Sequence, residues 1–88
     1  MKYDIENLKK RLIYRSQYRG TKEMDKLISS FVKENINKIE LEELLELEEF
    51  LNIDDDSLYK MYNDRKNAKK NKNLNNIIQL FLNFDYKT

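Results

Sequence analysis

Residues 11–32 read RLIYRSQYRGTKEMDKLISSFV and contain the only glycine of an 88-residue chain that has no proline. Gly20 can adopt the positive φ angle that ends many helices, so we place a junction between two helices there. Thr21 follows as an N-cap candidate, and Glu23 falls in the first turn of the second helix, where unsatisfied amides favour a carboxylate. We expect the rest of the chain to be organised around this junction.

Apolar residues on both sides of the junction recur at helical spacing. After it come Met24, Leu27, Ile28, Phe31 and Val32, the cleanest amphipathic pattern in the chain. Before it, Ile5, Leu8 and Leu12 share one face of a helix that Asp4 is placed to cap. Each of these two predicted helices therefore has a face to bury.

The remaining residues predict three more helices. Asn37 and Glu40 resemble a capping box at the start of a leucine-rich helix with an acidic outer face. The run 54–56 of three aspartates offers N-caps for a fourth helix. A basic connection at 63–73 precedes a last apolar helix, which either packs back onto the bundle or forms a dimer interface. We predict one all-α domain over residues 1–88, a bundle of about five helices that is monomeric if its last helix packs back.

Composition excludes most catalytic chemistry. The chain has no cysteine and no histidine, so disulfides, thiolates, imidazole bases and the usual zinc sites are excluded. One glycine cannot form a glycine-rich phosphate loop. We therefore expect a protein that is not an enzyme, holds no metal and acts on another macromolecule.

Hydropathy and charge give an expectation for location. No apolar run approaches the roughly 18–20 residues that cross a bilayer, and the N-terminus has no signal-peptide core. Charged residues make up 38% of the chain, but the net charge is only +1. We expect a cytoplasmic bacterial protein with no membrane span. The nearly balanced charge also argues against a general nucleic-acid binder.

Two surfaces are candidates for binding a macromolecule. The first is the junction, where Arg15, Tyr18, Arg19, Gly20 and Glu23 combine bidentate cations, an amphipathic ring and a backbone open to close approach. The second is the basic segment at 65–72, which would attract phosphates in a small nucleic-acid-binding or antitoxin-like regulator. We rank the junction first because the basic segment has no recognition-helix context.

The junction also has purely structural interpretations. Arg11, Arg15 and Arg19 are spaced by four, so they form a column on one side of the helix if the helix reaches Arg19. Their charges would either interact favourably with the C-terminal end of the helix dipole or face an anion. Arg19 and Glu23 would pair across the turn while Gly20 ends the helix. Composition and spacing leave both alternatives open.

The pattern Arg11-Leu12-x-Tyr14-Arg15-Ser16-x-x-Arg19-Gly20-x-x-Glu23-Met24-Asp25 resembles the signature of the SdhE/Sdh5 family of succinate dehydrogenase assembly factors. Phe31 and the acidic run before Leu58-Tyr59 extend the resemblance to about residue 62. Relatives commonly have a tryptophan in the fourth helix, where this chain has Met61, so local packing should differ there.

The resemblance implies a five-helix bundle that acts as an assembly chaperone. Such a protein binds the flavoprotein subunit of succinate dehydrogenase, or of fumarate reductase in some bacteria, and promotes covalent attachment of FAD to a histidine of that subunit. It holds no cofactor tightly itself. Arg19, Gly20 and Glu23 match the motif directly as partner-binding residues, and Arg15, Tyr18 and Asp25 are added as neighbouring candidates.

Overall fold

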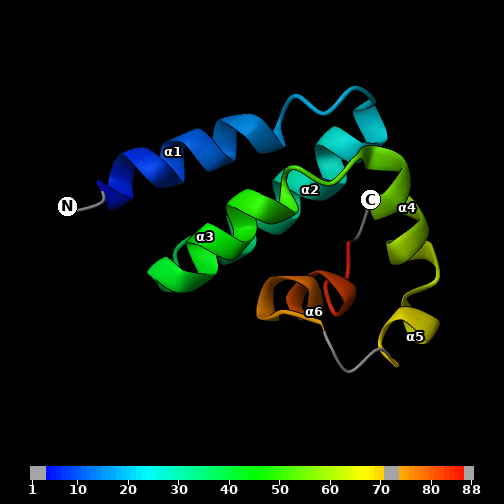
Figure 1. Ribbon diagram of the computed structural model, residues 1–88. Helices are drawn as coiled ribbons and strands as arrows, with labels where there is room; N and C mark the ends of the chain where they lie inside the picture. The colour runs from blue at the N-terminus through cyan, green and yellow to red at the C-terminus, as the bar shows by residue number, and fades with distance from the viewer. Residues whose placement is uncertain (1–3, 71–73, 87–88) are drawn as a thin grey trace.

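The computed structural model describes residues 4–70 and 74–86, and these fold into helices joined by short turns (Figure 1). The helices are α1 (Ile5–Ser16), α2 (Lys22–Asn35), α3 (Leu41–Phe50), α4 (Asp55–Asn63), α5 (Arg65–Ala68) and α6 (Asn76–Leu82). No strand occurs in these ranges. The all-α prediction is confirmed, and the helix beyond the expected five is α5, a single turn inside the segment predicted as a basic connection.

α1, α2 and α3 lie side by side, and α4, α5 and α6 gather at one end of this layer (Figure 1). α1 packs against both α2 and α3, while α6 fills the space between α3 and α4. Burial of Ile77, Phe81 and Leu82 shows that the last helix packs back onto the bundle. The monomeric state expected from this packing stays a prediction.

Aromatic rings fill the centre of the core. Phe31 of α2 contacts Phe50, Phe81 and Phe84, with ring centroids 5.3–5.5 Å apart. Phe84 lies just beyond the end of α6, so the short tail also contributes to the core. Tilted and edge-on rings at this spacing add to the stabilisation from burial.

Three of the predicted caps are confirmed. The side chains of Asp4, Thr21 and Asp54 accept hydrogen bonds from the first-turn amides of α1, α2 and α4. The predicted capping box of Asn37 and Glu40 is wrong, because residues 36–39 form the turn after α2 and Glu40 is itself the N-cap of α3. The backbone N–H of Glu40 donates to the Glu43 carboxylate at 3.4 Å.

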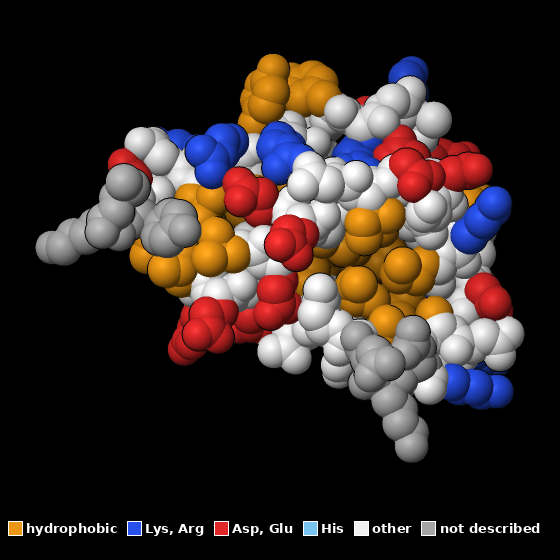
Figure 2. Space-filling view, viewed as in Figure 1, with side chains coloured by type: hydrophobic (Ala, Val, Ile, Leu, Met, Phe, Trp, Pro, Cys, Tyr) orange, Lys and Arg blue, Asp and Glu red, His pale blue; other side chains and the backbone are white. Residues whose placement is uncertain are grey.

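The surface has an acidic region and an exposed aromatic region. Acidic side chains gather over α3, as its sequence predicted, and a hydrophobic protrusion rises near the C-terminal end of α1 (Figure 2). The large exposed apolar side chains there are Tyr14 and Tyr18, at 64% and 69% exposure. Their ring centroids are 4.8 Å apart, so the two rings shield each other in part.

Candidate functional site

The loop between α1 and α2 is the geometric centre of the candidate site. α1 ends at Ser16 with Gln17 as its C-cap, two residues earlier than a helix ended by Gly20 would require. Gly20 has a φ angle of +122°, so the predicted need for positive φ is confirmed, although it arises in the loop. A side chain at Gly20 would be strained by this φ angle, because L-residues rarely adopt it.

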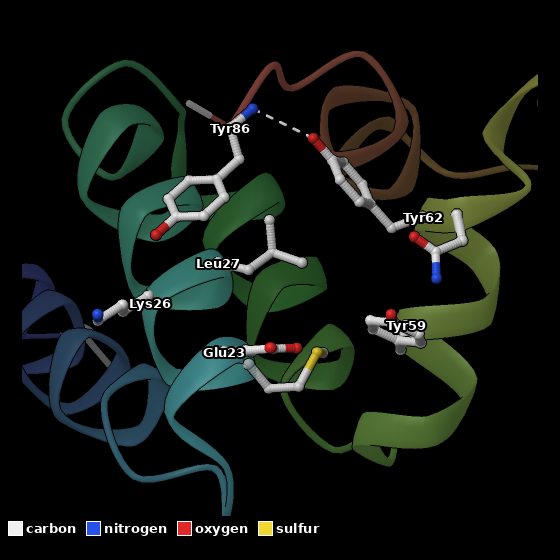
Figure 3. A pocket seen from close by; sticks show the side chains of 8 residues that line it. Glu23, Lys26, Leu27, Tyr59, Tyr62 and Tyr86 are labelled. Carbon is white, nitrogen blue, oxygen red and sulfur yellow. Dashed lines mark hydrogen bonds between the residues drawn. The ribbon is translucent and has the colours of Figure 1, made fainter. Parts of the chain in front are cut away.

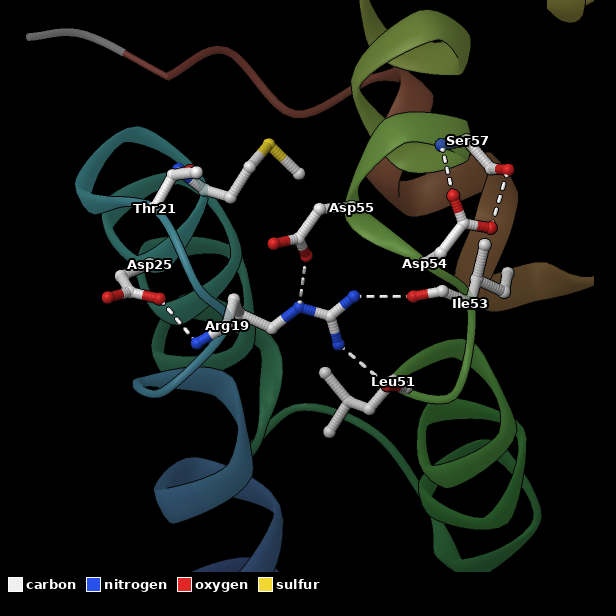
Figure 4. A network of polar contacts seen from close by, with 9 residues as sticks. Arg19, Thr21, Asp25, Leu51, Ile53, Asp54, Asp55 and Ser57 are labelled. Atoms are coloured by element: carbon white, nitrogen blue, oxygen red, sulfur yellow. Dashed lines mark hydrogen bonds and ion pairs between the residues drawn. The ribbon is translucent and has the colours of Figure 1, made fainter.

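The side chain of Arg19 turns inward and joins this loop to the turn between α3 and α4 (Figure 4). Its Nε donates to Asp55 Oδ1 at 2.8 Å, and its two terminal nitrogens donate to the carbonyls of Leu51 and Ile53. Only 8% of the side chain is exposed. Guanidinium carries its donors in a fixed planar fork, so one arginine can satisfy all three acceptors at once.

Asp25 fixes the backbone of the same residue. Its Oδ1 accepts a hydrogen bond from the Arg19 N–H, from the first turn of α2. The side chain of Arg19 thus holds the loop on one flank and the main chain of Arg19 holds it on the other, as the dashed contacts of Arg19 in Figure 4 show. Asp25 therefore orders the loop through the main chain of Arg19.

Arg19 does not pair with Glu23, and that alternative from the sequence is wrong. The helical column of three arginines is also wrong at its last member, because Arg19 lies beyond the end of α1. The other two arginines, which lie on α1, contact α3 and the turn that follows it. Arg11 forms an ion pair with Glu48 at 3.1 Å, and Arg15 donates to the side chain of Asn52.

The remaining predicted residues face outward. Tyr18 is exposed beside Tyr14, and Gly20 is exposed at the tip of the loop. Glu23 lies on the first turn of α2, and its carboxylate points into a cavity between α2 and α4 (Figure 3). The structure thus brings the six predicted residues to one end of the molecule, with Arg19 and Asp25 turned into the fold and the others reaching the surface.

Sequence reasoning did not assign the roles of three contributors to this region. Asp55 was considered only as a helix cap, whereas it is the acidic partner of Arg19. Asn52 receives Arg15, and Tyr14 doubles the aromatic surface of Tyr18. The only available signal for Asp55 was one more carboxylate than a helix N-terminus needs, because Asp54 alone supplies the cap.

Asp54, the N-cap of α4, lies next in sequence to the Asp55 carboxylate that receives Arg19. The side-chain hydroxyl and backbone N–H of Ser57 donate to Asp54 and hold the pKa of that carboxyl below its ordinary value. Within residues 4–70 and 74–86 there is no cluster of acidic side chains suited to a metal ion. The arrangement can hold loops and present side chains to a partner.

Among the described cations of the basic segment, one is engaged within the fold and three are exposed. The guanidinium of Arg65 lies 4.4 Å from the centre of the Tyr62 ring and donates to the Tyr62 carbonyl. Lys66, Lys69 and Lys70 are exposed, and Lys72 lies outside the described residues.

Among the described residues, no helix is long and apolar enough to cross a membrane.

The family described as flavinator of succinate dehydrogenase, Sdh5, matches this chain over residues 10–85. The chain belongs to the Sdh5 family. The match includes all six predicted site residues and extends through the C-terminal third, beyond the part that the motif alone covers. Curated proteins and solved structures yielded no match. The Sdh5 family is one of assembly factors linked to the attachment of FAD in succinate dehydrogenase.

Proposed function

We propose that this Sdh5-family protein binds the flavoprotein subunit of succinate dehydrogenase and promotes covalent attachment of FAD to it. The match over residues 10–85 carries this proposal. The same binding mode would serve a fumarate reductase flavoprotein, which presents related chemistry. The chain acts as a chaperone in this proposal, and FAD remains the cofactor of its partner.

The docking surface in this proposal is the end of the molecule that contains the α1–α2 loop. Exposed Tyr18 and Tyr14 supply rigid apolar area of the kind that dominates binding energy at protein interfaces. Arg15 adds a cation beside these rings, in the hollow that Tyr14 and Tyr18 also line, and Glu23 adds a carboxylate on the first turn of α2. Arg19 contributes by holding the loop in a single conformation, which lowers the entropy lost on binding.

The mechanism in this proposal is positioning. Covalent flavin attachment is chemistry of the flavin and its acceptor histidine, so a protein without catalytic groups accelerates it by stabilising the flavoprotein conformation in which the two are aligned. Most of the effect should then come from differential binding to that conformation. A variant that docks weakly should lose stimulation in proportion to its lost affinity.

Co-expression with the flavoprotein tests the proposal. Covalent flavin is measured as fluorescence of the denatured subunit on a gel, with wild-type chain, Tyr18→Ser, Arg15→Gln or no chain present. We expect strong fluorescence with the wild type, and a loss of at least half of the stimulation with either variant. Lys33→Gln, an exposed residue near the far end of α2, is matched to Arg15→Gln in charge and should behave as wild type.

Equal fluorescence with and without the wild-type chain would refute the proposed function. Normal stimulation by both junction variants would instead retain the function and reject this docking surface. Thermal unfolding of each variant, followed by circular dichroism, separates a binding defect from a folding defect. Both substituted side chains lie at or near the surface, so we expect transitions close to that of the wild type.

A further inference from the structure

A cavity of about 450 Å³ lies between α2 and α4, on the side of the bundle covered by the C-terminal tail. Met24 and Leu27 form its floor on α2, Tyr59 and Tyr62 form the wall on α4, and Tyr86 of the tail forms a third side. Figure 3 shows these side chains converging on the cavity from three different parts of the chain. We call it the tyrosine groove.

A second hollow of about 450 Å³ continues the tyrosine groove toward the start of α4. The two share Glu23, Met24 and Tyr59, so Glu23 and Tyr59 lie where they meet. Asp55 and Asp56 line the second hollow, and Lys22 lies at its edge. The charge of Asp55 is already paired with Arg19 at 2.8 Å. Asp56 has a longer ion pair, 3.9 Å, with Lys60, and both of these side chains are exposed.

Glu23 and Lys26 are the charged residues that line the tyrosine groove, and the carboxylate of Glu23 points into it. Its carboxylate faces Tyr59 across the cavity, while the ammonium of Lys26 points away from it (Figure 3). The side chain of Glu23 forms no hydrogen bond or ion pair with any other residue within 4–70 and 74–86. A carboxylate so placed favours a cationic occupant and disfavours an anionic one.

The rings around Glu23 narrow the choice of cation. Guanidinium is planar and weakly hydrated, so it stacks on a tyrosine face while its N–H groups bind a carboxylate. The chain contains an example of such stacking, because Arg65 lies over Tyr62 at 4.4 Å. Tyr59, 46% exposed, offers an accessible ring beside the unpaired carboxylate.

We propose that the tyrosine groove is the receptor for an arginine side chain of the flavoprotein subunit, with Glu23 accepting its N–H groups and Tyr59 stacking on its plane. This inference rests on the proposed function and adds a chemical identity to part of the contact. It assigns Glu23 a direct binding role that is separate from the structural role of Arg19. It also extends the docking surface along α2 to α4 and to Tyr86.

The groove can be tested without the flavoprotein. N-acetyl-arginine amide is titrated into the ¹⁵N-labelled chain, with the citrulline analogue as a neutral control of the same shape and the lysine analogue as a non-planar cation. We expect amide shifts at residues of the tyrosine groove in the order arginine, lysine, citrulline. Glu23→Gln should weaken arginine binding by at least about threefold, the range expected for a partly exposed ion pair.

Glu34→Gln is the matched control, because Glu34 is an exposed glutamate near the other end of α2 and its loss changes net charge equally. Equal shifts with citrulline and arginine would overturn the proposal. Unchanged arginine binding in Glu23→Gln would overturn it as well. A stronger response to lysine would reject the stacked guanidinium.

Binding to the purified flavoprotein subunit is then measured for wild type, Glu23→Gln, Tyr59→Leu and Glu34→Gln. We expect at least a threefold loss for Glu23→Gln and for Tyr59→Leu, and none for Glu34→Gln. The affinity of Glu23→Gln should also depend less on salt, because one ion pair is removed. If wild type fails to bind, the proposed function fails, and the amide titration still decides the chemistry of the groove. If wild type binds and Glu23→Gln binds equally well, the groove proposal alone fails.

Discussion

α4 is held at both ends by contacts to segments that are not helical, and the two ends are built differently. At its first residue, Asp55 receives the guanidinium of Arg19 from the α1–α2 loop. Near its last residue, the Tyr62 hydroxyl donates to the Phe84 carbonyl at 2.6 Å and accepts from the Tyr86 N–H at 3.2 Å. The contact at the first end is made by the buried cation of Arg19, which donates to several acceptors. The contact at the second end is made by the neutral hydroxyl of Tyr62.

The difference lies in how the stabilisation is distributed. At the first end, a single side chain satisfies Asp55 and two backbone carbonyls, and no neighbouring group replaces it. At the second end, Tyr62 and Phe84 also contact the ring cluster, so the tail is held by packing as well as by hydrogen bonds. The first end should therefore be sensitive to one substitution, and the second should tolerate loss of its polar contacts.

Replacing Arg19 should have the largest effect. Arg19→Ala leaves a partly buried carboxylate and two carbonyls without their donors, so we expect a loss of about 3–5 kcal/mol in the free energy of unfolding. For a domain of this size, that corresponds to a fall in Tm of roughly 12 °C or more. Thermal and urea unfolding followed by circular dichroism measure it.

Two further variants show whether the fork geometry matters. Arg19→Lys keeps the charge but cannot reach three separated acceptors, so it should lose at least half as much stability as Arg19→Ala. Arg11→Ala is the control, because its ion pair with Glu48 is exposed and should contribute less than about 1 kcal/mol. A fully stable Arg19→Lys would show that the charge alone holds the loop.

Removing the phenol at the other end should have a smaller effect. Tyr62→Phe deletes the hydroxyl that bonds Phe84 and Tyr86 but keeps the ring, so we expect a loss of about 1–2 kcal/mol. Hydrogen exchange should accelerate at the Tyr86 amide and remain slow at the buried core helices. Tyr59→Phe is the control, since Tyr59 is 46% exposed. A loss as large as that of Arg19→Ala would refute the proposed distribution of stability.

The sequence was sufficient for most of the helical architecture. Apolar spacing located α2 because Met24, Leu27 and Phe31 face one side, and the N-caps at Thr21 and Asp54 are local contacts between residues three apart. The basic segment was not assigned a helix because it has almost no apolar residues to show periodicity, and α5 is one turn long.

The site was less predictable because its contacts are distant in sequence. The motif around Gly20 indicated where the candidate surface lies, but the direction of Arg19 depends on residues 51–55, more than thirty positions away. Two of its three partners are backbone carbonyls, which carry no signature in the residue types. The tyrosine groove needs Tyr86 of the tail beside α2 and α4, a juxtaposition that only the folded chain provides.

The smallest expected effect concerns the cap beside the Arg19 contact. Hydrogen bonds from Ser57 lower the pKa of Asp54 below its ordinary value of 3.8, so the ionised cap stabilises the folded state. This stabilisation is complete above about pH 4 and is lost as pH falls through the lowered pKa. Asp54→Asn keeps an N-cap acceptor but does not titrate, so its Tm relative to wild type should rise as the solution is acidified below pH 4. Asp56→Asn is the control, because Asp56 is exposed and has only a distant pairing with Lys60. A constant Tm difference between wild type and Asp54→Asn from pH 7 to pH 2.5 would show that the start of α4 depends on the Arg19 contact and not on the ionised cap.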